Sequence, residues 1–112
     1  MEVVMKKYTA KIDRPIGTIH HGTVYPINYG YIEGLIAGDG EEQDVYILSN
    51  LPENQKALKT FTGKRIAIVH RKDDVEDKWL LTSPAENFTK SEIEKAVHFQ
   101  EQYFDSKIEI VE

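Results

Sequence analysis

One segment of this 112-residue chain has helical periodicity, and it lies near the carboxyl end. Thr89 and Glu92 have the spacing of a capping box, in which each side chain bonds the backbone N–H of the other residue at the start of a helix. The apolar residues that follow recur every three or four positions, so one helix face is expected to pack on a core and the other to face water. The apolar stripe is Ile93, Ala96, Val97 and Phe104, and the residues expected to face water are Lys90, Glu94, Lys95 and Glu101.

Short β-strands are predicted for most of the remaining chain. The segment from Asp44 to Ser49 alternates, with Val45 and Ile47 on one side and Tyr46 and Leu48 on the other, which is the pattern of a strand. Turns rich in Gly, Pro and Asp separate this strand from its neighbours. The expected strands span residues 3–12, 23–32 (broken near Pro26 or Gly30), 44–49, 64–70, 79–82 and 107–111.

Roughly six short strands and one helix predict a mainly β (α+β) fold, a small β-barrel with the C-terminal helix packed on it. A chain of 112 residues is expected to form one domain spanning residues 1–112, because this length buries a sizeable core without splitting. Residues 50–59 are expected to form a loop with one helical turn.

Composition narrows the classes of partner and compartment. The formal net charge of −5 argues against nucleic acid or an anionic membrane surface as the main partner. The chain has no cysteine, so disulfides and thiolate metal ligands are excluded, and a reducing cytoplasm is the expected location. It also lacks a run of about 18 apolar residues and an apolar signal-peptide region, which predicts a soluble protein.

Four acidic residues lie in the six positions from Asp39 to Asp44, and the candidate ligands among them are Asp39, Glu41 and Asp44. Carboxylates at this spacing repel one another, and a hard divalent cation such as Mg²⁺ or Mn²⁺ would neutralise them. The alternative is a solvated hairpin turn, because Asp-Gly tolerates the positive φ that such turns require. The residues of this run alone leave both interpretations open.

A second acidic group lies downstream, and it is followed directly by Lys78. A hydrolase that uses two metal ions needs a second source of carboxylates of this kind. The alternative is a hairpin tip of mixed charge that faces water. The acidic residues of this group are Asp73, Asp74, Glu76 and Asp77.

The segments Tyr25-Pro-Ile-Asn-Tyr-Gly-Tyr31 and Asp39-Gly-Glu-Glu-Gln-Asp44 resemble the family I soluble inorganic pyrophosphatases. Members of that family carry Tyr-Pro, Asn-Tyr-Gly-Tyr and then Asp-Gly-Asp-Pro-x-Asp. The resemblance implies an OB-like barrel with flanking helices, and it supplies the closure of the strands into a barrel. It also implies hydrolysis of pyrophosphate, a small phosphate substrate, with Mg²⁺ or Mn²⁺ as cofactor, in a homo-oligomer.

The resemblance also implies roles for individual residues. Glu41 takes the place of the general base, and four other residues, Lys78 and Tyr29 among them, are implied to hold phosphate. The implied metal ligands are Asp39, Asp44, Asp77 and either Asp73 or Asp74, with Asp74 preferred; the implied substrate ligands are Tyr29, Lys78, Tyr103 and Arg14.

Several positions depart from the family pattern. Glu41 stands where aspartate is usual, and Phe104 follows Tyr103 where the family has a lysine. An acidic residue and a lysine that family members carry ahead of the Tyr-Pro segment have no convincing counterpart, and Arg14 is the only arginine there. These departures leave two alternatives to pyrophosphate hydrolysis. One is another phosphoanhydride such as a nucleotide; the other is a degenerate protein that binds metal, phosphate or a nucleotide, or acts as an assembly or regulatory module.

Overall fold

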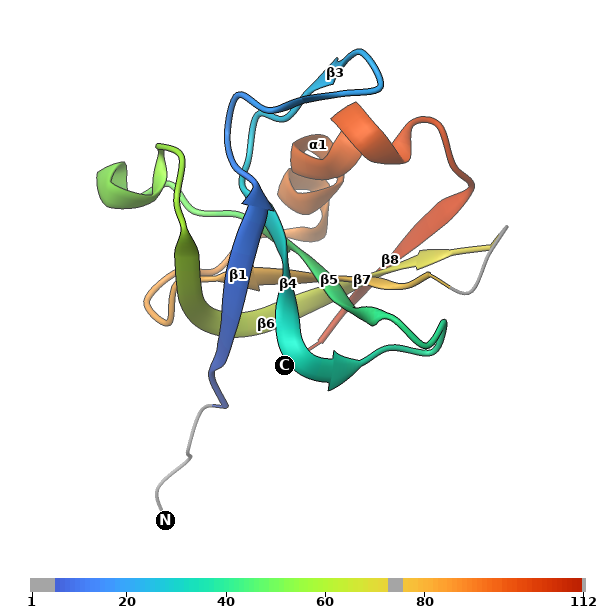
Figure 1. Ribbon diagram of the computed structural model, residues 1–112, viewed down its shortest axis with the longest axis horizontal. Helices are drawn as coiled ribbons and strands as arrows, with labels where there is room; N and C mark the ends of the chain where they lie inside the picture. Colours follow the sequence, from blue (N-terminus) through green and yellow to red (C-terminus); the bar gives the residue numbers. More distant parts are fainter. Residues whose placement is uncertain (1–5, 73–75, 112) are drawn as a thin grey trace.

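The computed structural model describes residues 6–72 and 76–111, which form a curled sheet with one α-helix against it (Figure 1). Six strands make up this sheet, and two further short strands form a separate hairpin. No helix among the described residues is long and apolar enough to span a membrane. In chain order the elements are β1 (Tyr8–Arg14), β2 (Ile19–His20), β3 (Thr23–Val24), β4 (Tyr29–Ile36), β5 (Glu42–Ile47), a 3₁₀ turn η1 (Pro52–Asn54), β6 (Thr60–Arg71), β7 (Lys78–Thr82), α1 (Lys90–Glu101) and β8 (Ser106–Ile110).

The sheet closes on itself because β6 is long enough to serve two neighbours. The strand order is β1-β4-β5-β7-β6-β8, and β1 pairs with β6 as well, so five strands form a barrel that β8 extends. Residues Thr60–Gly63 of β6 pair with β1, whereas residues from Lys64 onward pair with β7. The register shifts between Arg65 and Ala67, where the strand bends. The predicted small β-barrel with a C-terminal helix is confirmed, including the closure that the resemblance supplied.

Close approach of the backbone explains two glycines of the barrel. A Cβ at Gly30 would lie 1.9 Å from the carbonyl oxygen of Lys11 on the neighbouring strand β1. A Cβ at Gly63 would lie 2.1 Å from the carbonyl oxygen of Thr82. Only glycine fits at either position, so Gly30 of the Asn-Tyr-Gly-Tyr segment is required for the β1–β4 contact.

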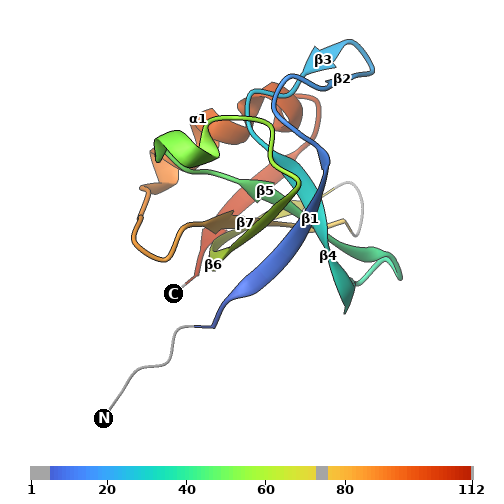
Figure 2. The ribbon, with the colours of Figure 1, turned by 60° about the vertical axis from the view of Figure 1, so that its left-hand side comes forward.

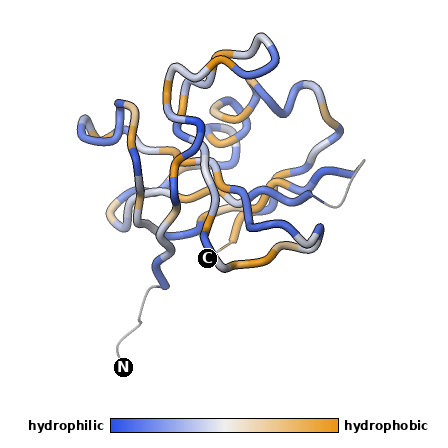
Figure 3. The backbone as a smooth tube through the Cα atoms, in the orientation of Figure 1, coloured by the Kyte–Doolittle hydropathy of each residue, from blue (hydrophilic) through white to orange (hydrophobic). Residues whose placement is uncertain are grey.

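Strand β5 is buried on both faces, and each face belongs to a different core. Val45 and Ile47 lie in a cluster inside the barrel with Phe61. Tyr46 and Leu48 belong to a second cluster, formed where α1 covers the sheet (Figures 2 and 3). The predicted alternation of this segment is therefore confirmed, and neither side of it faces water.

Helix α1 begins with the predicted capping box, whereas its last residue, Glu101, is buried and not exposed as predicted. The side chain of Thr89 accepts from the backbone N–H of Glu92 at 3.2 Å, and the Glu92 carboxylate accepts from the N–H of Thr89 at 2.8 Å. Ile93 and Val97 are fully buried, as expected. The expectation that Glu101 faces water is wrong, because this residue continues the buried stripe and is only 6% exposed.

Other expected boundaries shift by a few residues. The first described strand starts at Tyr8, and the expected residues 3–5 lie outside the described part of the chain. The expected strand 23–32 is two strands, β3 and β4, and β4 continues to Ile36. The helical turn in the loop 50–59 and the last strand are confirmed, as η1 and β8.

Candidate functional site

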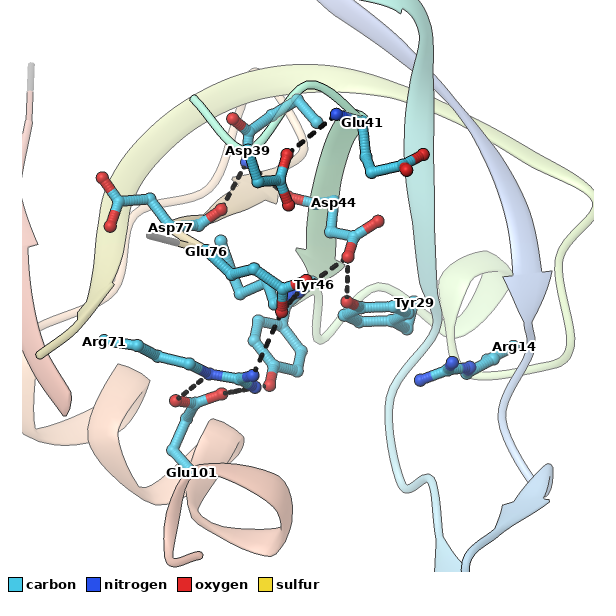
Figure 4. Close-up of polar contacts among 12 residues, drawn as sticks. Arg14, Tyr29, Asp39, Glu41, Asp44, Tyr46, Arg71, Glu76, Asp77 and Glu101 are labelled. Atoms are coloured by element: carbon cyan, nitrogen blue, oxygen red, sulfur yellow. Dashed lines mark hydrogen bonds and ion pairs between the residues drawn. The ribbon is translucent and has the colours of Figure 1, made fainter. Parts of the chain in front are cut away.

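Three adjacent strands bring Tyr29, Asp44 and Lys78 together on the face of the sheet that α1 covers (Figure 4). Asp44 lies on β5, between β4 and β7, and has the same strand parity as the buried Tyr46. Its Oδ2 accepts from Lys78 Nζ at 2.7 Å and from the Tyr29 hydroxyl at 2.8 Å. The structure therefore joins three residues that the sequence spreads over 50 positions.

A second set of ion pairs continues from Lys78 to the end of the helix. Glu76 Oε2 lies 3.3 Å from Lys78 Nζ and 3.6 Å from Arg71 Nη1. Arg71 makes a bidentate contact with Glu101, with Nε–Oε1 and Nη2–Oε2 distances of 3.2 and 2.8 Å. The Arg71 guanidinium lies 3.7 Å from the centre of the Phe104 ring. Because the side chains of Arg71 and Glu101 are each 6% exposed, this pair is shielded from solvent.

The tyrosines at this site stay protonated and donate. Burial, followed by the charge of Asp44, raises the pKa of Tyr29 far above its usual value. Burial and the charge of Glu101 act in the same way on the pKa of Tyr46, whose hydroxyl donates to Glu101 Oε2 at 2.6 Å. Burial alone would lower the pKa of Arg71, and hydrogen bonding to Glu101 with its charge raises it instead.

Asp39 and Glu41 lie in the tight turn between β4 and β5 (Figure 4). Asp39 Oδ1 accepts from the backbone N–H of Glu41 at 2.9 Å, a local bond that holds the turn. Gly40 within this turn has φ 86°, so the turn chemistry expected from Asp-Gly is present. The Glu41 side chain, by contrast, is exposed.

Asp77 and Glu76 point to opposite sides of the chain because they are consecutive in an extended segment. The Asp77 carboxylate contacts His70 Nδ1 at 3.1 Å and points away from Asp44, whereas Glu76 points toward Lys78 (Figure 4). The backbone carbonyl of Asp77 accepts from Gln43 Nε2 at 2.7 Å. The predicted ligand Asp74 and its alternative Asp73 lie outside the described residues.

The two remaining candidates differ in their distance from this centre. Arg14 donates to the Tyr25 hydroxyl at 2.8 Å, and its guanidinium lies 5.3 Å from the Tyr29 ring centre, so it borders the site. Tyr103 is 67% exposed beyond the end of α1. Within the described residues, no hydrogen bond or ring contact connects Tyr103 with Asp44 or Lys78.

The donor set suits a hard cation by its chemistry. Within residues 6–72 and 76–111, no three His, Asp or Glu side chains are already gathered as a metal centre. Carboxylates nevertheless outnumber cations here, since Arg71 and Glu101 neutralise each other and Lys78 is one ammonium among several carboxylates. Mg²⁺ binds oxygen ligands of this type, so the chemistry of these side chains is compatible with a divalent ion.

Sequence reasoning missed Glu76, Arg71 and Glu101 as members of the site. Each could have been found from periodicity. Glu76 lies two positions before Lys78, on the same side of the chain, and Arg71 lies two positions after Val69, on the buried face of β6. Glu101 lies four positions after the buried Val97, on the same helix face.

Solved structures similar to this chain are inorganic pyrophosphatases. The enzyme from Ehrlichia chaffeensis superposes with a TM-score of 0.71 at 19% identity, over 98% of this chain and 89% of its own. The enzyme from Helicobacter pylori gives 0.63 at 14% identity (99% and 86% covered), and that from Thermus thermophilus 0.60 at 13% (95% and 80%). No protein-family model matches the sequence, and no curated protein matches it. At these identities the likeness establishes the fold, and this chain has the barrel fold of the inorganic pyrophosphatases.

Proposed function

We propose that the chain hydrolyses inorganic pyrophosphate, or a related phosphoanhydride, with a divalent cation such as Mg²⁺ or Mn²⁺. The observation that carries this proposal is the meeting of Asp44, Lys78 and Tyr29 on three strands of a pyrophosphatase fold. The excess of carboxylates supports the need for a cation, because pyrophosphate is itself strongly anionic. The expectations of a cytoplasmic homo-oligomer stay predictions.

The cation would be held by Asp44 and Asp39, with Asp74 as a further predicted ligand. Asp77, whose carboxylate contacts His70 in this structure, would have to turn toward Asp44 to act as the fourth predicted ligand. When bound, it would neutralise phosphate charge and lower the pKa of a coordinated water. Glu41 is proposed to accept the proton of the attacking water, because its carboxylate is exposed at the turn beside these ligands.

The hydrogen-bond donors around Asp44 would bind and position the phosphates. Tyr29 keeps its proton and can donate it to a phosphate oxygen, and Lys78 carries the charge nearest to Asp44. Arg14 borders the Tyr29 ring and is the next cation toward the barrel's β1 side. Tyr103 is proposed as a substrate ligand on the resemblance alone.

The test is release of phosphate from pyrophosphate with Mg²⁺ or Mn²⁺, comparing the wild type with Asp44→Asn. Loss of a ligand that positions the reacting groups is expected to lower the rate about 100-fold. Asp105→Asn is the matched control, because Asp105 is an exposed aspartate in the turn after α1. Folded wild-type protein without metal-dependent release above the Asp44→Asn background would refute hydrolysis of this substrate.

A second candidate function is binding of metal, phosphate or a nucleotide without turnover. The specific observation in its favour is that Lys78 already pairs with Asp44 and Glu76, while glutamate stands at the position of the proposed base. Pyrophosphate or a nucleotide that raises the midpoint of thermal unfolding, in protein that releases no phosphate, would favour this candidate.

A further inference from the structure

We infer that Lys78 competes with the divalent cation for Asp44 and Glu76, so that its ammonium sets how tightly the site takes metal. The inference rests on the proposed function in one respect, namely that Asp44 serves a metal ion, and it adds Glu76, which contacts the same ammonium, as a second carboxylate of the site. It adds a second task for a residue otherwise assigned to the substrate.

The ammonium of Lys78 lies between two carboxylates from different elements. Nζ is 2.7 Å from Asp44 Oδ2 and 3.3 Å from Glu76 Oε2, with the Tyr29 ring centre 5.9 Å away. The Lys78 side chain is only 5% exposed, whereas those of Asp44 and Glu76 are 36% and 42% exposed. Both carboxylates are therefore more accessible than the ammonium to an ion that arrives from solvent.

Two cations cannot share the same carboxylate oxygens at full strength. A divalent ion at Asp44 would lie within a few ångström of Nζ, where like charges repel strongly in a partly buried site. Metal uptake must therefore displace the ammonium or be weakened by it. A site with the ammonium removed would keep its carboxylates and gain room for the ion.

Of the two cations at the site, Lys78 and Arg71, Lys78 is the one that can move. Arg71 is fixed by two parallel bonds to Glu101 and by the Phe104 ring. Lys78 holds its partners through a single ammonium on a flexible four-carbon stem, so it can rotate away without breaking a bidentate contact. An ammonium displaced by metal would be released next to the Tyr29 hydroxyl, where a phosphate oxygen could take up its charge.

The direct test is calorimetric titration with Mn²⁺ of the wild type, Lys78→Gln and Lys78→Met, each checked for folding by circular dichroism. Mn²⁺ affinity is expected to rise about tenfold or more in both variants, because removal of one nearby positive charge favours a bound cation. Lys95→Gln is the matched control: it removes the same charge from an exposed position on α1, and less than about twofold change is expected. Unchanged or weaker Mn²⁺ binding in both Lys78 variants would overturn the inference.

A second measurement needs no variant. Amine-reactive labelling of the wild type, read by mass spectrometry, is expected to increase at Lys78 when Mn²⁺ is added and to stay constant at Lys95. Labelling of Lys78 that Mn²⁺ leaves unchanged or lowers would contradict displacement. This measurement decides the point even if both Lys78 variants fail to fold.

The outcomes separate this inference from the proposed function. Tighter Mn²⁺ binding in the Lys78 variants, with no phosphate release by the wild type, would retain the competition and reject the hydrolysis. Phosphate release by the wild type, with Mn²⁺ affinity unaffected by Lys78, would retain the hydrolysis and reject the competition.

Discussion

The acidic residues of the candidate site are held in two different ways. Asp39 is restrained by its own turn, through a bond to the backbone N–H two residues on. Asp44 is restrained by Tyr29 and Lys78, which come from two other strands. The bond of Asp39 forms wherever the turn forms, whereas the contacts of Asp44 require β4, β5 and β7 to lie side by side. Asp39 is therefore restrained locally and Asp44 by the tertiary structure, while both side chains stay partly exposed.

The largest loss of stability should come from breaking the buried ion pair between Arg71 and Glu101. Arg71→Met leaves Glu101 buried without its cation, which is expected to lower the free energy of unfolding by about 3–5 kcal/mol in urea denaturation. Lys11→Met is the control, because the Lys11–Glu33 pair is more than half exposed and solvent screens it, so a much smaller loss is expected. Equal losses in the two variants would show that the buried pair does not differ from a surface pair.

A smaller effect is expected at the site itself. Tyr29→Phe removes one donor to Asp44 while Lys78 remains, so the free energy of unfolding should fall by about 1 kcal/mol. If Tyr29 also holds substrate, the rate of phosphate release should fall even under conditions in which the variant is fully folded. A variant with full activity and reduced stability would limit Tyr29 to a structural role.

A further test concerns the pH dependence of stability at His70, which lies in a surface contact. His70 bridges Asp77 and Glu109, with Lys107 as its cross-strand neighbour, and hydrogen bonding to Glu109, outweighing burial, raises the pKa of His70 above 6.5. Because the folded-state pKa is raised, the bridge stabilises fully below about pH 6.5 and is lost as pH rises through the folded-state value. The free energy of unfolding, measured by urea denaturation from about pH 5.5 to about pH 8.5, should depend less on pH in His70→Gln than in the wild type. With a side chain 38% exposed, the change should stay below about 1 kcal/mol.

The smallest change in stability is expected in the turn. Glu41→Gln should alter the free energy of unfolding by no more than about 0.5 kcal/mol, because the side chain is exposed. The same variant should lower phosphate release about 100-fold or more if Glu41 is the base. Loss of stability without loss of activity would reverse the distinction drawn between the turn and the strand.

Elements with a strong local signal could be predicted well. The capping box at Thr89 and the alternation around Val45 were read correctly, because both depend on neighbours a few positions away. The placement of Glu101 in water was wrong, since helical spacing puts it beside Val97, and its buried partners Arg71 and Tyr46 make that position tolerable for a charge. The candidate site was predicted in part, with Asp44, Lys78 and Tyr29 meeting and Tyr103 lying apart.

The sequence by itself determined the strands, the one capped helix and the turn carboxylates, because periodicity, capping and turn chemistry act over a few residues. Only the tertiary structure decided that Lys78 lies against Asp44 and that Arg71 neutralises Glu101. These pairs span 34 and 30 positions. Asp44 and Lys78 meet because β5 and β7 pair in parallel, with Val45 opposite Trp79, and Arg71 at the end of β6 meets Glu101 at the end of α1. Long-range pairing depends on closure of the whole barrel, and no local pattern of residues encodes that closure.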